Sequence, residues 1–251
     1  MHATGVAGDT ASRIHRLDPR AKIAGFAGIT VVGVSTPPRY WAVLAVCALA
    51  LTTIAAAARI GPGVILSRAR VVLPLVVFVA VFVPFVRGGE TVDLGPLAVS
   101  RDGLTTFAAV SSKALIGTVS AVLLGATTSF PDVLHGLERM RAPRLLTLIA
   151  AFMYRYLFVI GGEARRMRVA LAARGYRPRH ALQVAAIGRV ATALFLRTFE
   201  RGERVYVAML ARGYVGAAPR LRALAFARAD VLFLTALAAA LVPLRVMIEV
   251  M

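Results

Sequence analysis

Long apolar runs alternate with short polar segments along most of this chain. A helix needs about 20 apolar residues to cross roughly 30 Å of hydrocarbon. Five runs meet or approach that length, at approximately 21–37, 40–58, 71–86, 104–128 and 223–244. Any one run could be a buried helix of a soluble protein, and the first and third are short. The five together predict an all-α integral membrane protein with about five transmembrane helices.

The first apolar run opens with a helix-start signal. Asp18 can accept hydrogen bonds from free backbone N–H groups, and Pro19 fits the first turn, where its missing N–H costs nothing. Lys22 follows one turn later and is expected to extend its amine to the membrane surface. Proline and glycine clusters at 36–38 and 61–63 end the first two helices of the expected bundle.

The pattern changes between residues 129 and 222. A short helix is predicted over 129–141, and two long amphipathic helices follow over about 145–174 and 181–212. An offset of 38 residues aligns their apolar stripes position by position. Six residues of these stripes are candidates to support a coupling role of the helices: Tyr156, Glu163, Met167 and Ala170 in the first helix, and Val205 and Ala208 in the second. Both helices are expected to be too charged to span a bilayer and too apolar to lie free in water.

Composition and charge agree with a membrane location. The chain has 251 residues, of which 59% are hydrophobic, and its net charge is +18. Basic segments alternate with neutral or acidic ones, as the positive-inside rule requires, so nucleic acid is not the expected partner. The alternation predicts that the amino terminus lies on the cytoplasmic side of the membrane and the carboxyl terminus on the outer side. The predicted division is 1–128 (terminal segment and four spans), 129–222 (cytoplasmic helices) and 223–251 (last span).

Each long helix ends in the same tripeptide followed by tyrosine. Ala173-Arg174-Gly175 closes the first helix, and Ala211-Arg212-Gly213 closes the second. Arginine and glycine are common at ordinary helix ends, because arginine favours the negative end of the helix dipole and glycine caps it. Two matched copies favour a docking role instead. The guanidinium fork suits carboxylates and carbonyls in a partner's groove, and the small alanines would let the ends enter deeply.

Lys113 lies about ten residues into the fourth apolar run, flanked by two serines. A lysine inside a membrane is costly and marks a candidate functional residue. Two interpretations remain open. The lysine either faces the bundle and bonds serines and carbonyls, or it contacts a partner membrane subunit.

The chain carries no arrangement of residues that points to catalysis. There is no G-x-x-x-x-G-K-[ST] phosphate loop, and the only lysines are Lys22 and Lys113. The four histidines lack metal-ligand spacing, and Cys47 is the only cysteine. We therefore expect no catalytic, metal-binding or cofactor-binding residue, and no enzyme activity in this chain.

The chain resembles the T component of energy-coupling-factor transporters over nearly its whole length, and most closely the cobalt-type T component. The resemblance includes residues 15–22 at the first span and residues 153–157 and 163–167 on the first long helix. The paired Ala-Arg-Gly ends are the most specific part of the likeness, and residues 154–167 favour the cobalt type.

The resemblance implies a coupling subunit in the cell membrane of a prokaryote. Such a subunit joins two ABC-type ATPases, which bind the ATP, to a small substrate-binding membrane subunit, the S component. Arg174 would dock on one ATPase and Arg212 on the other. The transported substrate would be cobalt ion for cobalamin biosynthesis, bound by the S component.

Alternatives to this interpretation stay open at the level of sequence. A T component for biotin or another vitamin would carry the same paired ends. A stand-alone secondary transporter would need polar sites at the membrane midplane, for which only Lys113 is plausible. A nucleic-acid-binding or lipid-binding membrane protein would use the arginines without the apolar stripes, and a membrane enzyme would need chemistry that the chain lacks.

Overall fold

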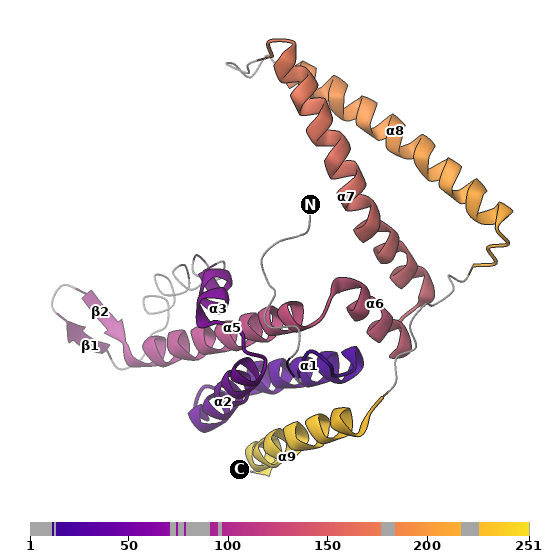
Figure 1. Cartoon of the computed structure of the whole chain (residues 1–251). Helices are drawn as coiled ribbons and strands as arrows, with labels where there is room; N and C mark the ends of the chain where they lie inside the picture. The colour runs from indigo at the N-terminus through magenta and orange to yellow at the C-terminus, as the bar shows by residue number, and fades with distance from the viewer. Residues whose placement is uncertain are drawn as a thin grey trace. The chain divides into compact units, whose positions relative to one another are not determined.

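The computed structural model describes Ser12, Pro74, Phe78 and residues 14–70, 91–94, 97–176, 184–216 and 226–250. These residues form helices and one short β-hairpin (Figure 1). The chain divides into two compact units. The first unit holds residues up to Met140 together with those from Leu224 onward, and the second unit is Arg141–Ala223.

The first unit is a helical bundle with a small hairpin. Its helices are α1 (Pro19–Ser35), α2 (Trp41–Ala57), α3 (Pro62–Ala69), α5 (Arg101–Thr127), α6 (Phe130–Arg139) and α9 (Arg228–Val250). Strands β1 (Thr91–Leu94) and β2 (Leu97–Ser100) pair antiparallel, with Thr91 opposite Ser100. The hairpin lies in a polar segment between apolar runs. The prediction of an all-α membrane fold is confirmed in its helical architecture, to which this hairpin is an addition.

Helix α1 lies at the centre of the first unit, because small residues let its neighbours approach closely. A Cβ added to Gly25 would lie 2.7 Å from Cε1 of Phe233 on α9. A Cβ on Gly136 of α6 would lie 2.9 Å from Cδ1 of Ile23. Phe26 and Ile29 of the same helix are almost completely buried. Close approach at glycine is the usual way in which membrane helices gain packing contacts.

The predicted spans at 21–37, 40–58, 104–128 and 223–244 coincide with α1, α2, α5 and α9. The predicted third span, 71–86, lies outside the described residues except for Pro74 and Phe78. Among the described helices, three are long and apolar enough to cross a membrane, over Thr105–Thr127, Arg144–Ala173 and Arg228–Val246. Helix α2 is a shorter apolar helix of 17 residues.

The second unit consists of α7 (Arg144–Ala173) and α8 (Val184–Ala211), the two long helices predicted from the stripes. Helix α7 contains a stretch long and apolar enough to cross a membrane, which the prediction that both helices are too charged did not take into account. The cytoplasmic placement of α7 therefore stays a prediction. Its cluster of arginines at 165–168 occupies only the last third of the helix, so the first two thirds form an apolar segment.

Helix α6 groups with the first unit and not with the two long helices. The unit boundary falls between Met140 and Arg141, whereas the predicted division placed it near residue 129. The close contact of Gly136 with Pro19 and Ile23 explains this grouping, because it fastens α6 to the beginning of α1. The membrane sidedness of the three predicted segments stays a prediction.

Candidate functional site

The first Ala-Arg-Gly end forms a tight helix cap. Helix α7 stops at Ala173, and Gly175 adopts a left-handed φ of +73°. The N–H of Tyr176 donates to the carbonyl of Leu171 at 3.1 Å, and the N–H of Gly175 donates to the carbonyl of Ala172 at 3.0 Å. This pair of hydrogen bonds is the Schellman motif, which satisfies carbonyls at the end of a helix.

The second Ala-Arg-Gly end has the same geometry. Gly213 has a φ of +76°, and its N–H donates to the carbonyl of Leu210 at 2.9 Å. The N–H of Tyr214 donates to the carbonyl of Met209 at 3.0 Å. Both tyrosines are half-buried, as expected when the residue after the glycine packs on the residue five positions earlier. The recurring tripeptide and tyrosine therefore encode one local structure twice. We call these ends the first tip (Ala173–Gly175) and the second tip (Ala211–Gly213).

Each tip presents an arginine at the point where its helix stops. Arg174 and Arg212 are exposed, and in the described part of the chain neither guanidinium has an ion pair or a hydrogen-bond partner. Ala173 and Ala211 beside them are exposed as well. Five N–H donors on a rigid fork are thus available to another molecule, next to side chains too small to obstruct it.

The two tips lie at opposite ends of the helix pair. Helix α8 begins near the first tip and runs away from it, so the second tip is at its far end (Figure 1). Helix α8 has 28 residues, which at 1.5 Å per residue makes it about 42 Å long. The structure therefore does not bring Arg174 and Arg212 together into one site. It sets them apart as two separate contact points on one pair of helices.

Glu163 joins the two long helices between the tips. Its Oε1 accepts from Nη1 of Arg197 on α8 at 2.6 Å, and its Oε2 accepts from Nε of Arg166 one turn along α7 at 3.1 Å. The offset of 38 residues aligned Glu163 with Arg201, whereas the structure pairs it with Arg197, one turn earlier. The alignment relates equivalent positions in two helices and does not state which residues touch.

The other supporting residues differ in their surroundings. Tyr156 is half-buried and stacks on Phe152, with ring centroids 6.3 Å apart. Met167 and Val205 are half-buried, and Ala170 and Ala208 are exposed. Both helices also expose large apolar side chains, including Met153 and Phe195. The stripes are therefore only partly covered by the described residues of this chain.

Lys113 bonds a neighbouring helix. Its Nζ donates to the carbonyl of Val34, in the last turn of α1, at 2.9 Å. The hydroxyl of the flanking Ser112 donates to the carbonyl of Ala108 on its own helix at 2.7 Å. This is the arrangement expected of a lysine that faces the bundle and bonds a carbonyl. Contact with a partner membrane subunit stays a prediction.

A buried polar cluster at the amino end of α1 escaped the sequence analysis. Lys22 was expected to reach the membrane surface, but it is only 2% exposed. Its Nζ donates to the carbonyls of His15 at 3.1 Å and Thr127 at 2.9 Å. Asp230, also buried, accepts from the N–H of Asp18 at 2.7 Å. The predicted cap at Asp18 is confirmed, because its Oδ1 accepts from the N–H of Arg20 at 2.9 Å. The lysine's partners are distant in sequence, and no local signal marks them.

Comparisons with known proteins place this geometry in context. The family described as CbiQ, cobalt transport protein, matches residues 10–222. The energy-coupling factor transporter transmembrane protein EcfT of Listeria innocua is 30% identical, over 84% of this chain and 84% of its own length.

Two further relatives are much longer than this chain. A protein of Methanocorpusculum labreanum, provisionally named as a fused cobalt transport protein CbiMQ, is 32% identical over 55% of this chain. A protein of Bifidobacterium longum, provisionally named as an ABC transporter ATP-binding protein (BL0043), is 30% identical over 91% of this chain. The matches cover only 24% and 31% of these two proteins.

Proposed function

Because the chain belongs to the CbiQ cobalt transport protein family, we propose that it is the transmembrane coupling subunit of an energy-coupling-factor importer. In this role it links two ABC ATPases to a substrate-binding membrane subunit. The observation that carries the proposal is the pair of matching tips. Each exposes an arginine without a partner among the described residues, and the two lie at opposite ends of one helix pair.

The tips suit the task of binding two copies of a similar groove. One arginine fork can form two parallel hydrogen bonds to a carboxylate, which fixes its orientation as well as its position. The Schellman cap holds the guanidinium's backbone at the helix end, so the tip and the helix behave as one body. When the ATPases approach each other on binding ATP, a tip held in each groove transmits that displacement along α7 and α8.

A relative supports the link to ATP hydrolysis. The Bifidobacterium protein is named for ATP binding, yet only 31% of it matches this chain, which has no phosphate loop. The ATP-binding part of that relative is therefore expected outside the matched region. In the present system the same chemistry would be supplied by separate ATPase subunits, and this chain is not itself an enzyme.

We propose cobalt ion as the transported substrate, bound by the separate S component. The support is the description of the family and the name of the fused relative. The alternation of arginine along the chain supports a cytoplasmic location for the amino terminus and for residues 129–222, where ATP is available, and an outside carboxyl terminus.

Co-purification tests the proposal directly. The tagged chain is isolated in mild detergent from its native membrane as wild type and as Arg174→Ala/Arg212→Ala. A matched control, Arg168→Ala/Arg189→Ala, removes two other exposed arginines of the same helices. Wild type and control should bring down two ABC ATPases and a small membrane protein, and the tip variant should lose the ATPases. Loss of a buried charged anchor costs about 2–5 kcal/mol.

Two outcomes would contradict the proposal. If the tip variant retains the ATPases as well as the control does, the tips are ordinary helix ends. If the wild-type chain is isolated alone, a stand-alone carrier becomes the better interpretation. The identity of the co-purifying small membrane protein, and the ion it binds, checks the cobalt assignment separately.

A further inference from the structure

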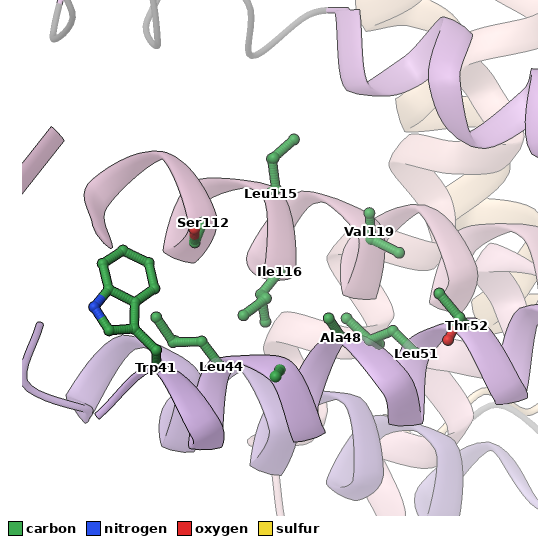
Figure 2. Close-up of a pocket in the computed structure, with 10 residues that line it drawn as sticks. Trp41, Leu44, Ala48, Leu51, Thr52, Ser112, Leu115, Ile116 and Val119 are labelled. Carbon is green, nitrogen blue, oxygen red and sulfur yellow. The ribbon is translucent and has the colours of Figure 1, made fainter. Parts of the chain in front are cut away.

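An apolar groove lies between α2 and α5 in the first unit (Figure 2). Its volume is about 470 Å³, within the range of about 300–1,000 Å³ typical of small-molecule sites. Its walls include Trp41, Leu44, Ala48 and Leu51 of α2 and Leu115 and Ile116 of α5. The groove is therefore large enough and apolar enough to hold a hydrocarbon chain.

The polar groups in the groove wall are already satisfied. The hydroxyl of Thr52 donates to the carbonyl of Leu49 at 2.9 Å, and that of Ser112 donates to Ala108 at 2.7 Å. Water needs two to four polar partners to occupy a cavity, and these walls offer almost none. Because α5 is apolar enough to cross a membrane and α2 is a shorter apolar helix, the groove meets hydrocarbon and not water.

The lining of the groove holds no cation, but basic residues are close in sequence to the lining residues Trp41 and Ser112 at one of its ends. Figure 2 shows Trp41 and Ser112 near one end and Thr52 and Val119 near the other. Arg39 lies two residues before Trp41, with its guanidinium 4.8 Å from the centre of the Tyr40 ring. Lys113, next to Ser112, uses one of its three N–H donors on the carbonyl of Val34. Arg245 of α9 donates to the adjacent carbonyl of Ser35 at 3.4 Å.

These positions match the two parts of a lipid molecule. Trp41 is 42% exposed, and tryptophan prefers the headgroup level of a membrane. The cations around the turn between α1 and α2 would then lie at the level of the phosphates. We propose that the groove binds one acyl chain of an anionic phospholipid, whose phosphate contacts Arg39 and Lys113. The ligand class follows from the basic residues beside one end of the groove and from its apolar walls.

The chain contains its own reporter for this site, since Trp41 is its only tryptophan. The purified full-length protein is placed in vesicles of mixed phosphatidylcholine and phosphatidylglycerol, with bromine atoms on the acyl chains of one lipid at a time. Bromine quenches tryptophan fluorescence on close approach. We expect about a tenfold preference for quenching by the anionic lipid, because each basic group near the phosphates favours it.

Two variants separate the headgroup from the acyl chain. Arg39→Gln should reduce the preference for the anionic lipid, while Ala48→Leu should fill the groove and reduce quenching by both lipids. Ala57→Leu is the matched control: Ala57 is exposed on the same helix, and nine residues at 100° each place it on the face opposite Ala48. It should leave the quenching unchanged.

Three results would overturn the proposal. Equal quenching by both lipids in the wild type would mean that only the general lipid annulus is present. Unchanged quenching in Ala48→Leu would mean that no acyl chain enters the groove. If brominated lipid no longer quenches Trp41 when the chain is isolated together with its partner proteins, a helix of a partner occupies the groove instead of a lipid. This test does not involve the tips, so it can fail or succeed independently of the proposed coupling function.

Discussion

At the scale of single residues, the tips show how a short sequence can determine a precise local structure. A positive φ is unfavourable for any residue with a Cβ, and it is glycine that stands at positions 175 and 213, where φ is +73° and +76°. The tyrosine that follows supplies the apolar contact of the cap. The arginine just before the glycine is left at the surface. The proposed contact with a partner and the geometry of the cap thus depend on different residues of the same motif.

This separation predicts the effect of replacing the glycines. Gly175→Ala and Gly213→Ala should each destabilise the local cap by about 1–2 kcal/mol, because an L-residue resists the left-handed conformation. Amide hydrogen exchange in the last turn of each helix should become about 5–30-fold faster, as measured by mass spectrometry of peptides that cover 170–176 and 208–214.

Gly188→Ala is the matched control for these variants. Gly188 lies within α8 with open space around its Cα, so alanine there should stabilise the helix by up to about 1 kcal/mol. Equal protection of the tips in wild type and in both glycine variants would show that the caps do not depend on glycine.

Residue-scale features were also the most predictable from sequence. The cap at Asp18 and the glycine caps depend on neighbours within a few positions, so local rules identify them. Lys22 was mispredicted because the carbonyl of Thr127, 105 residues away, accepts its hydrogen bond. A rule that treats each span alone assigns such a lysine to the surface, since it has no information about a partner on another helix.

At the scale of elements, the pattern of apolar residues predicted the existence and approximate bounds of α1, α2, α5, α6, α7, α8 and α9 well, but it missed the short helix α3. It predicted their neighbours less well. Helix α6 was grouped with the long helices because it is next to them in sequence, but Gly136 packs it on α1. Similarly, the matched stripes suggested which positions are equivalent in α7 and α8, whereas the pairing of Glu163 with Arg197 depends on how the helices cross.

The pairing of Glu163 predicts how α7 and α8 are held together. Arg197→Ala should broaden the distribution of distances between the two helices, because it removes the ion pair at 2.6 Å. The effect should be modest, since the side chain of Arg197 is largely exposed and exposed ion pairs contribute little to stability. It can be measured by electron spin resonance between nitroxides on Ala170→Cys and Ala191→Cys, in a Cys47→Ala background.

Arg201→Ala provides the control, because that position was paired with Glu163 only by alignment. It should leave the distance distribution unchanged. A broadening of equal size in both variants would remove the special role of Arg197. Since exposed ion pairs are screened by salt, the difference between the two variants should also shrink at high ionic strength.

At the scale of the whole molecule, the first unit is assembled from both ends of the chain. Helix α9 packs against α1 at Gly25, and Asp230 accepts from the backbone of Asp18. Lys22 bonds the end of α5 at Thr127. A few buried polar groups thus fasten together the ends of three helices that the sequence keeps far apart.

The hydrogen bonds of Lys22 to His15 and Thr127, which we call the Lys22 clamp, predict a large effect of one substitution on stability. Lys22→Met should lower the free energy of unfolding by about 3 kcal/mol, because buried carbonyls lose a charged donor. Lys113→Met, the change at the chain's other lysine, should cost less because its hydrogen bond is exposed. Thermal unfolding in detergent, followed by the fluorescence of Trp41, compares the two melting temperatures. Equal shifts would contradict the proposed importance of the Lys22 clamp.

The contact between Asp18 and Asp230 also has a consequence for biosynthesis. The two residues are 212 positions apart, so at about 5–20 residues per second Asp230 is synthesised about 10 to 40 s after Asp18. The second unit lies between them in sequence and is synthesised during that interval. The amide of Asp18 therefore finds its native partner only after the helices with both tips have been translated. A chain released prematurely would leave the first unit open, and cellular quality control could recognise it as incomplete.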